Sequence, residues 1–91
     1  MKKTVYARIY GIVQGVGLRY SVLMKAKELG LKGYVKNMPD FSVELEVEGD
    51  GDKIDTLLNF IKNGVRWAKV ERIDTKIQDY QNKYEDFNIV H

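Results

Sequence analysis

The stretch GIVQGVGLRYS, from Gly11 to Ser21, places three glycines within seven residues, directly after a strand-like run. Because glycine weakens both strands and helices, such a cluster predicts that the backbone turns sharply or closely approaches another group. Residues 4–10, just before it, alternate between apolar and polar side chains, which is typical of a half-buried strand. Residues 19–29, just after it, have apolar side chains at helical spacing and end at Gly30. The stretch therefore joins a strand to a helix.

The rest of the chain continues with short strands and one more helix. The further predicted elements are a strand at 33–37, a strand at 43–48, a helix between Asp50 and Gly64, a strand at 68–77 and a short edge strand at 87–90. The apolar residues of the 68–77 strand change parity between Val70 and Ile73, which predicts a bulge or a bend. Residues 78–86 are polar and are expected to form a loop.

The order of these elements is βαββαβ, which predicts an α+β fold of the ferredoxin-like type. We expect an antiparallel sheet of four to five strands with both helices on one face and water on the other. Glu44, Glu46 and Glu48 alternate with apolar residues and should point to the open face. The second strand is expected to run antiparallel to the first. Residues 1–91 are expected to form a single domain.

Composition narrows the class of protein. The chain has 91 residues, no cysteine and a formal net charge of +2 with a pI near 8.8. This mild basicity favours a small anionic ligand over a nucleic acid. Arg8 interrupts the segment after the MKK start, so a secretion signal is not expected, and no run is apolar enough to cross a membrane. We therefore expect a cytoplasmic protein.

The glycine loop has the ingredients of an anion site. The N-terminus of a helix offers unpaired N–H groups and partial positive charge, and glycines allow successive N–H groups to converge. Arg19, at the start of the helix, could hold two phosphate oxygens at once. The spacing matches neither the nucleotide P-loop nor the dinucleotide fingerprint. On residue types alone, a tight turn with a solvated Arg19 explains the stretch equally well.

Asn37 is a second polar candidate, at the end of the strand that precedes the Pro39–Asp40 turn. Asparagine often initiates turns, and on residue type alone this explanation is the simpler one.

At this point the sequence resembles a known family. GIVQGVGLR resembles the acylphosphatase signature G-x-V-Q-G-V-x-[F/Y]-R, with matches at Gly11, Val13, Gln14, Gly15, Val16 and Arg19. GYVKNMPDFSVE resembles the second signature, G-[F/Y/W]-[A/V]-x-N-x-x-D-G-x-V-E, with matches at Gly33, Tyr34, Val35, Asn37, Asp40, Val43 and Glu44. The order and spacing of the two motifs extend the resemblance over nearly the whole chain.

The resemblance implies a hydrolase, free of metal and cofactor, that cleaves acyl phosphates into a carboxylate and inorganic phosphate. It implies that Arg19 and the backbone N–H groups of the loop bind the phosphoryl group; the loop residues are Gln14, Gly15, Val16, Gly17, Leu18 and Arg19. It also implies that Asn37 orients the attacking water. The expected ligands are a small acyl phosphate and inorganic phosphate or sulfate, with a monomeric protein and no nucleic-acid or membrane partner. His91, the single histidine, is expected to be a solvated chain end.

Two residues depart from the family pattern. Leu18 replaces the aromatic residue beside the arginine, which should alter packing under the loop. Phe41 stands where the family has glycine, so we expect a strained backbone at the hairpin tip and an exposed ring that could mark a contact surface.

Other functions are compatible with the same fold. Tyr6, Tyr10 and Tyr34 share the predicted open face, where aromatic residues stack RNA bases in some modules, although the acidic strand on that face opposes phosphates. A regulatory domain that binds phosphate without turnover is a second alternative, and a module of a larger maturation enzyme is a third.

Overall fold

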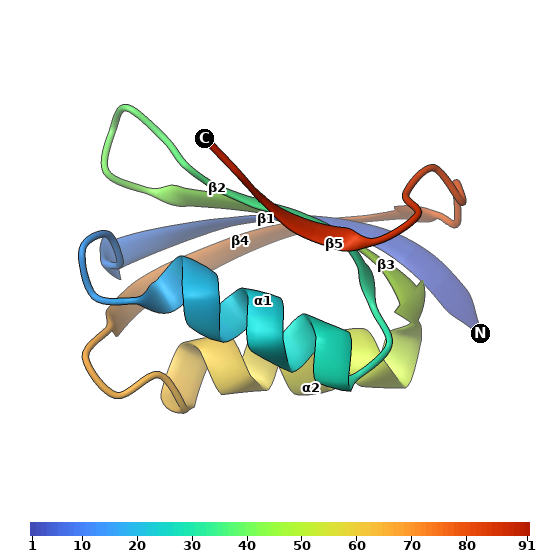
Figure 1. The fold of residues 1–91 in the computed structure, drawn as a ribbon, viewed down its shortest axis with the longest axis horizontal. Coiled ribbons are helices and arrows are strands. Elements are labelled where there is room, and N and C mark those ends of the chain that lie inside the picture. The colour runs from blue at the N-terminus through green and yellow to red at the C-terminus, as the bar shows by residue number, and fades with distance from the viewer.

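The strand-to-helix loop lies between the first strand and the first helix of a two-layer structure. A computed structural model describes all of residues 1–91. In chain order its elements are β1 (Lys2–Ile12), α1 (Leu18–Glu28), β2 (Lys32–Asn37), β3 (Val43–Asp50), α2 (Gly51–Asn63), β4 (Lys69–Asp79) and β5 (Phe87–Val90). Both helices pack on the same face of the five-stranded sheet, as predicted (Figure 1). No helix is long and apolar enough to span a membrane.

The strand order is β4-β1-β3-β2-β5. Both β1 and β2 pair antiparallel with β3, so they run in the same direction. The expectation that β2 runs antiparallel to β1 was therefore wrong, because β3 lies between them. As a result, the C-terminal ends of β1 and β2 lie at the same end of the sheet. The loop after β1 and Asn37 at the end of β2 thus share one end of the molecule.

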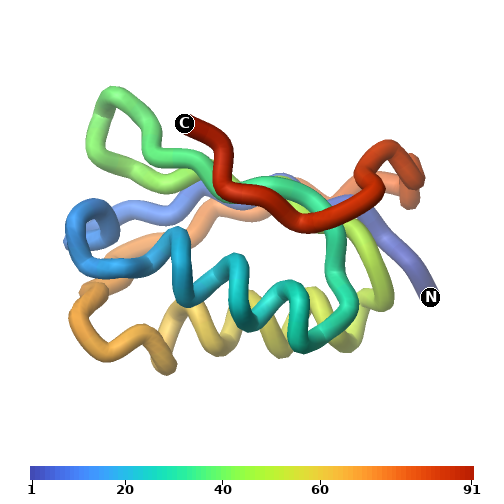
Figure 2. The backbone as a smooth tube through the Cα atoms, viewed as in Figure 1, coloured from blue at the N-terminus to red at the C-terminus, as the bar shows by residue number.

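The sheet is mixed, which corrects the expectation of a wholly antiparallel sheet. The fifth strand, β5, pairs in parallel with β2 at the edge opposite to β4. Residues 80–86 carry the chain from one edge of the sheet to the other, as the backbone trace shows (Figure 2). Because this connection returns across one end of the sheet, β5 runs opposite to β4 and hence along β2.

The core lies between the sheet and the helices. It contains sixteen buried apolar side chains, supplied by inward-facing strand residues and by one stripe of each helix. The stripes are Leu18, Val22 and Ala26 on α1 and Ile54, Leu57 and Ile61 on α2. Asp50 caps α2 by accepting a hydrogen bond from the backbone N–H of Asp52, as expected from the sequence.

The predicted irregularity in β4 is present where it meets β1. Tyr10 lies opposite Arg72 and Gly11 opposite Val70, so Glu71 is an extra residue on β4. A Cβ at Gly11, whose φ is +131°, would overlap the carbonyl oxygen of Lys69. The first glycine of the cluster therefore permits close contact between β1 and β4.

The second face of the sheet is less open than predicted. Glu48 is only 2% exposed and Glu46 only 8%, because residues 80–84 fold over them. The Thr4 hydroxyl donates a hydrogen bond of 2.7 Å to the Glu48 carboxylate. The alternating pattern of β3 correctly placed these glutamates on the face away from the helices. It gave no sign that a distant loop would cover them.

Candidate active site

Residues 13–17 form a loop that leaves its backbone N–H groups free. Gly15 and Gly17 have φ angles of +74° and +77°, and Gly17 is the N-cap of α1 without a side-chain cap. The first helical hydrogen bond runs from the N–H of Ser21 to the carbonyl of Gly17, at 3.0 Å. No backbone N–H from residue 14 to residue 20 donates to an acceptor within the chain. A helix N-terminus with these free donors is a favourable place for an anion.

Two buried side chains anchor this loop at its ends. Val13 and Leu18 are each 1% exposed and belong to the core cluster. Leu18 thus packs in the core beneath the loop. The loop between them is held from below while its N–H groups remain accessible.

A cleft of about 210 Å³ opens beside the loop and the first turn of α1. Its lining residues are Val13, Gly15, Gly17, Leu18, Arg19, Tyr20, Ile89 and His91. The structure therefore brings Arg19 together with Gly15, Gly17 and Leu18 of the predicted set. Gln14, Val16 and Asn37 lie outside the lining of this cleft.

His91 is exposed, as expected of a solvated chain end, and in addition it lies beside Arg19. The Arg19 Nη1 atom is 3.4 Å from the His91 Nδ1 atom. His91 follows β5 and lines the same cleft as the glycine loop, although its side chain remains exposed. Sequence reasoning missed this contact because it depends on the parallel pairing of β5 with β2.

Asn37 is the last residue of β2 and carries an unpaired acceptor. Its side-chain Oδ1 atom is buried and has no hydrogen-bond partner in the chain. The hairpin closes without the Asn37 side chain, through hydrogen bonds from the N–H of Met38 to Ser42 O and from the N–H of Phe41 to Met38 O. The turn therefore gives no reason for asparagine at this position, and a buried acceptor without a partner is costly.

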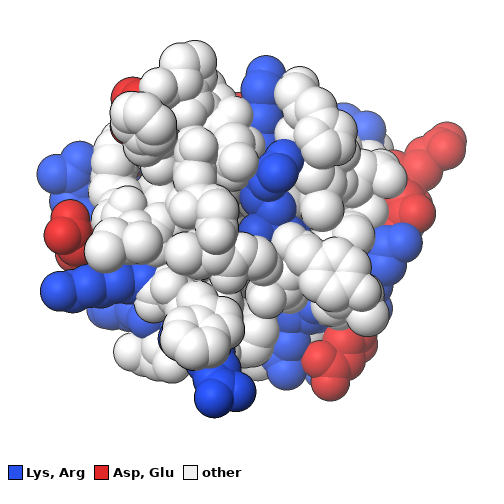
Figure 3. Space-filling view, turned by 60° about the vertical axis from the view of Figure 1, so that its left-hand side comes forward, with Lys and Arg blue, Asp and Glu red and all other residues white.

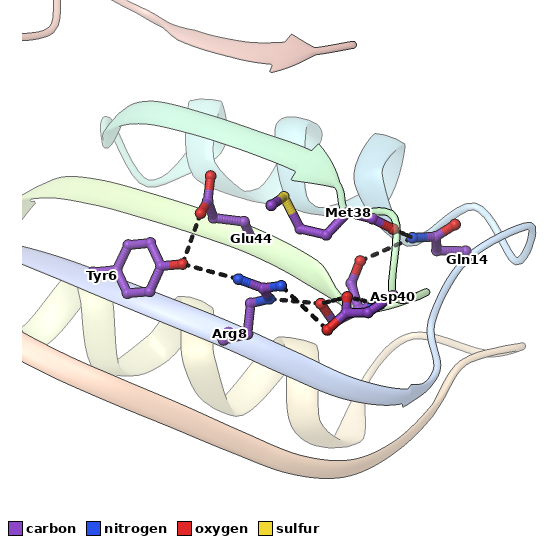
Figure 4. Close-up of polar contacts among 7 residues, drawn as sticks. Tyr6, Arg8, Gln14, Met38, Asp40 and Glu44 are labelled. Carbon is purple, nitrogen blue, oxygen red and sulfur yellow. Dashed lines mark hydrogen bonds and ion pairs between the residues drawn. The ribbon is translucent and has the colours of Figure 1, made fainter.

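The side chain of Gln14 links the glycine loop to this hairpin. Its Nε2 atom donates hydrogen bonds of 2.8 Å to Met38 O and 2.9 Å to Ser42 O (Figure 4). The sequence analysis assigned Gln14 only a backbone role, so this contact was missed. The signal that could have indicated this contact was the polar side chain of Gln14 itself, placed in the glycine loop directly after the apolar Val13. The bond fixes the position of the loop relative to the strand end that carries Asn37.

A cluster of polar side chains on β1 and β3 holds the same hairpin from the other side (Figure 4). The Arg8 Nε atom donates to Ser42 Oγ at 2.6 Å, and Nη2 contacts Asp40 Oδ2 at 3.2 Å. Hydrogen bonds from the Ser42 hydroxyl and backbone N–H, aided by the Arg8 guanidinium, lower the pKa of Asp40. The Tyr6 hydroxyl donates to Glu44 at 2.7 Å behind this cluster. Arg8 is therefore a structural residue of the hairpin.

Phe41 occupies the tip of the hairpin with a φ of +70°. Its side chain is 75% exposed. The expectation of strain at a position where the family has glycine is therefore confirmed.

The end of the molecule that carries the loop and the hairpin has little negative charge. Figure 3 turns this end towards the viewer, and uncharged atoms cover most of it. Lys and Arg atoms occupy its centre and parts of its margin, whereas Asp and Glu atoms occur only at the margin. The structure contains no group of three or more His, Cys, Asp or Glu side chains placed to hold a metal ion.

Comparisons with known proteins agree with these features. The family model for acylphosphatase matches residues 5–89. An acylphosphatase from Caldanaerobacter subterraneus subsp. tengcongensis is 53% identical over 98% of this chain and 99% of its own length. The crystal structure of acylphosphatase from Bacillus subtilis matches with a TM-score of 0.93 and 34% identity over the full length of both chains. Full-length HypF, in its phosphate- and nucleotide-bound form, matches this chain with a TM-score of 0.90 and 32% identity over 12% of its own length.

Proposed function

This chain belongs to the acylphosphatase family of acyl phosphate hydrolases, and we propose that Arg19, the loop of residues 14–19 and Asn37 perform the hydrolysis. The observation that carries the proposal is the row of free backbone N–H groups beside Arg19 at the N-terminus of α1. These donors and the guanidinium suit a phosphoryl group that carries two negative charges. The proposed ligands are accordingly a small acyl phosphate and its product, inorganic phosphate.

The reaction needs positioning and charge stabilisation more than covalent help from the protein. In phosphoryl transfer the charge is spread over the oxygens of the transferred group, while the nucleophile and the leaving group lie roughly in line. The loop N–H groups and Arg19 would stabilise these oxygens in the transition state. Because their donors are fixed by the helix terminus, they need little reorganisation when the substrate reacts.

Asn37 would hold the attacking water. Its side-chain amide makes no hydrogen bond within the chain, so it is available to orient a water. The Gln14 side chain keeps the hairpin in register with the glycine loop, so the water would be aimed at a phosphorus atom in a fixed place.

The bonds and protons balance without a protein acid or base. The water oxygen forms a bond to phosphorus as the bond from phosphorus to the acyl oxygen breaks. The electron pair leaves with the carboxylate, which needs no proton. The protons of the water pass to the phosphate product, whose own oxygens accept them.

The structure weakens the RNA-binding alternative by accounting for the aromatic residues on the other face. The hydroxyls of Tyr6 and Tyr34 donate to the two oxygens of the Glu44 carboxylate, at 2.7 and 2.9 Å. These rings therefore sit over an acidic group that repels phosphates. A face built in this way is poorly suited to stacking bases along an RNA strand.

The test is release of inorganic phosphate from benzoyl phosphate, measured with and without EDTA. We expect the wild-type activity to persist in EDTA. Arg19→Ala and Asn37→Ala should each lower kcat/KM by about 10²-fold or more, as when a positioned transition-state donor is lost. Arg72→Ala removes an equal charge from the exposed edge strand β4 and should retain nearly full activity.

Binding of sulfate separates the two proposed roles. Arg19→Ala should weaken sulfate binding, whereas Asn37→Ala should leave it within about twofold because the water site is not part of the anion site. Near wild-type turnover in either variant would overturn the assignment of that residue.

A further inference from the structure

His91 lines the cleft and follows the strand that pairs with the one ending at Asn37. Lys36 pairs with Val90 in the parallel register of β2 and β5, so Asn37 and His91 follow as the next neighbouring residues. Side chains alternate along a strand, and Phe87 and Ile89 of β5 face the helices. His91 continues this alternation and faces the N-terminus of α1, where it meets Arg19. The imidazole therefore lies beside the residue proposed to bind phosphate, just beyond the strand that neighbours the one carrying Asn37.

The contact with Arg19 depends on the protonation of the imidazole. A guanidinium has only donors, so the Nδ1 atom at 3.4 Å from Arg19 Nη1 can form a hydrogen bond only as the acceptor of a neutral ring. When the ring is protonated, two cations face each other and the direct contact becomes repulsive. An anion that lies between them would remove this repulsion and contact both groups.

The cleft contains no other charged side chain that could perform this role. Among the side chains that line it, only Arg19, His91 and the Tyr20 phenol are charged or titratable; His91 also carries the α-carboxylate of residue 91. Lys36, on the neighbouring strand β2, alternates to the opposite face of the sheet from Val35, which is buried in the core. No acidic side chain lines the cleft, so a bound anion would be free to contact both the imidazolium and Arg19.

We propose, on the premise of the mechanism above, that His91 is an additional phosphoryl-binding residue and that anion binding in the cleft is coupled to uptake of a proton by its imidazole. The protonated ring then donates a charge-assisted hydrogen bond to the bound phosphoryl group beside Arg19. This role adds to the loop and Arg19 and requires no change in the bonds that form and break during hydrolysis.

The coupling has a defined sign. Binding and protonation favour each other by the same factor, so the anion binds more tightly at acid pH, where the imidazole is charged. We expect sulfate to bind about 3- to 10-fold more tightly at pH 5.5 than at pH 8, which corresponds to a rise of about 0.5 to 1 pH unit in the titration midpoint of the ring. Sulfate is the suitable probe because it keeps the same charge over this range.

The experiment uses the fact that the chain has a single histidine. Its Hε1 proton gives one NMR signal that titrates with pH and can be followed without and with saturating sodium sulfate. A higher midpoint with sulfate supports the proposal. A midpoint that is unchanged or lower would overturn it, because the ring would then only accept a hydrogen bond from Arg19. Sodium chloride at equal ionic strength controls for general screening.

Two variants complete the test. His91→Gln should bind sulfate with nearly the same affinity at pH 5.5 and pH 8, and at pH 5.5 it should raise KM for benzoyl phosphate several-fold while kcat changes little. The double variant His91→Gln with Asn88→His moves the only histidine to the exposed residue on the opposite face of β5. Its signal should titrate with the same midpoint with and without sulfate.

The outcomes distinguish this proposal from the proposed function. If sulfate fails to bind the wild-type protein, or binds equally well to Arg19→Ala, the anion site itself is wrong. If sulfate binds through Arg19 with an affinity that His91→Gln leaves unchanged at both pH values, only the role of His91 fails.

Discussion

Two loops at opposite ends of the sheet offer backbone N–H groups, and they differ in whether the chain supplies the acceptor. In the glycine loop, the N–H groups of residues 14–20 donate to no atom of the protein. In the loop after β4, the N–H groups of Gln81, Lys83 and Tyr84 donate to the buried carboxylate of Glu48, at 3.2, 2.9 and 3.3 Å. The N–H groups of the loop after β4 therefore have a carboxylate of the chain as their acceptor, whereas those of the glycine loop have none.

The difference separates an anion site that stabilises the fold from one that can bind a ligand. Burial alone would raise the pKa of Glu48, but hydrogen bonds from Thr4 and from the N–H groups of the covering loop outweigh it and lower the pKa. Glu48 thus remains charged and fixes the loop that leads to β5. The glycine loop has no such internal anion, so its donors remain available to phosphate.

The largest expected effect on stability comes from removing the internal anion. Glu48→Ala leaves the N–H groups of Lys83 and Tyr84 and the Thr4 hydroxyl without their acceptor, whereas the Gln81 N–H keeps its bond to Thr4 Oγ1. Loss of a buried, hydrogen-bonded carboxylate of this kind costs about 3 kcal/mol of unfolding free energy, or about 10–20 °C in Tm for a domain of this size. Urea unfolding measures the loss, with Glu85→Ala, an exposed glutamate, as control.

The catalytic end should be affected little by that change. We expect kcat per folded molecule of Glu48→Ala to remain within about twofold of wild type, since the loop and Arg19 lie at the other end of β1. A large loss of kcat in a variant that is still folded would mean that the two ends are coupled.

Lowering the pH should gradually remove the stabilisation that the Glu48 carboxylate provides. A carboxylate whose folded-state pKa is lowered contributes stability above its unfolded pKa, about 4.3 for glutamate, and this contribution is lost as the pH falls through the folded value. The difference in unfolding free energy between wild type and Glu48→Gln should therefore be constant from pH 7 to about pH 5 and shrink as the pH falls towards 3. A difference that stays constant down to pH 3 would contradict the lowered pKa of Glu48.

Sequence patterns predicted the elements well because each depends on local periodicity. The strands, helices and caps follow from alternation, helical spacing and residues such as Asp50 and Gly64. The glycine loop with Arg19 was also visible, because a helix N-terminus is a local feature. The direction of β2 relative to β1 could not be predicted in this way, because it depends on which strand lies between them in the sheet.

The missed contacts of the candidate site are all long-range. Gln14 meets the hairpin across 24 and 28 residues of chain, and Arg19 meets His91 across 72. Glu48 is buried by a loop more than 30 residues away. No periodicity records such pairs, since they arise only when the sheet order is known.

A smaller effect is expected where the free donor array is held in place. Gln14→Ala removes both hydrogen bonds to the hairpin while leaving the backbone N–H groups and Arg19 intact. We expect kcat for benzoyl phosphate to fall about tenfold, because the water site and the phosphoryl site lose their fixed separation. Sulfate affinity should stay within about twofold of wild type, because the backbone N–H groups and Arg19 that bind the anion are unchanged.

That split between kcat and binding identifies a positioning role. A variant in which sulfate affinity falls together with kcat would show that the Gln14 side chain shapes the anion site itself. Gln14→Glu serves as the matched variant, because a carboxylate cannot donate to the two carbonyl oxygens and should lower kcat at least as much.

The smallest expected effect is a gain in stability at the hairpin tip. Phe41 has a φ of +70°, and its side chain is 75% exposed, so the ring contributes little burial. Relief of a left-handed conformation is worth about 1–2 kcal/mol, whereas the added flexibility of glycine in the unfolded chain costs about 0.5–1 kcal/mol. Phe41→Gly should therefore raise the unfolding free energy by about 0.5–1 kcal/mol, measurable as an increase in the urea midpoint.

Phe41→Ala isolates the backbone from the ring. Alanine has the same backbone restriction and lacks the aromatic surface, so we expect little or no gain from it. An equal gain in both variants would mean that the exposed ring, and not the backbone angle, destabilises the protein. The activity of both variants should stay close to wild type, because Arg8 and Gln14 hold the hairpin through Ser42 whichever residue lies at its tip. The strain at Phe41 would then be a local cost that the surrounding hydrogen bonds keep from reaching Asn37.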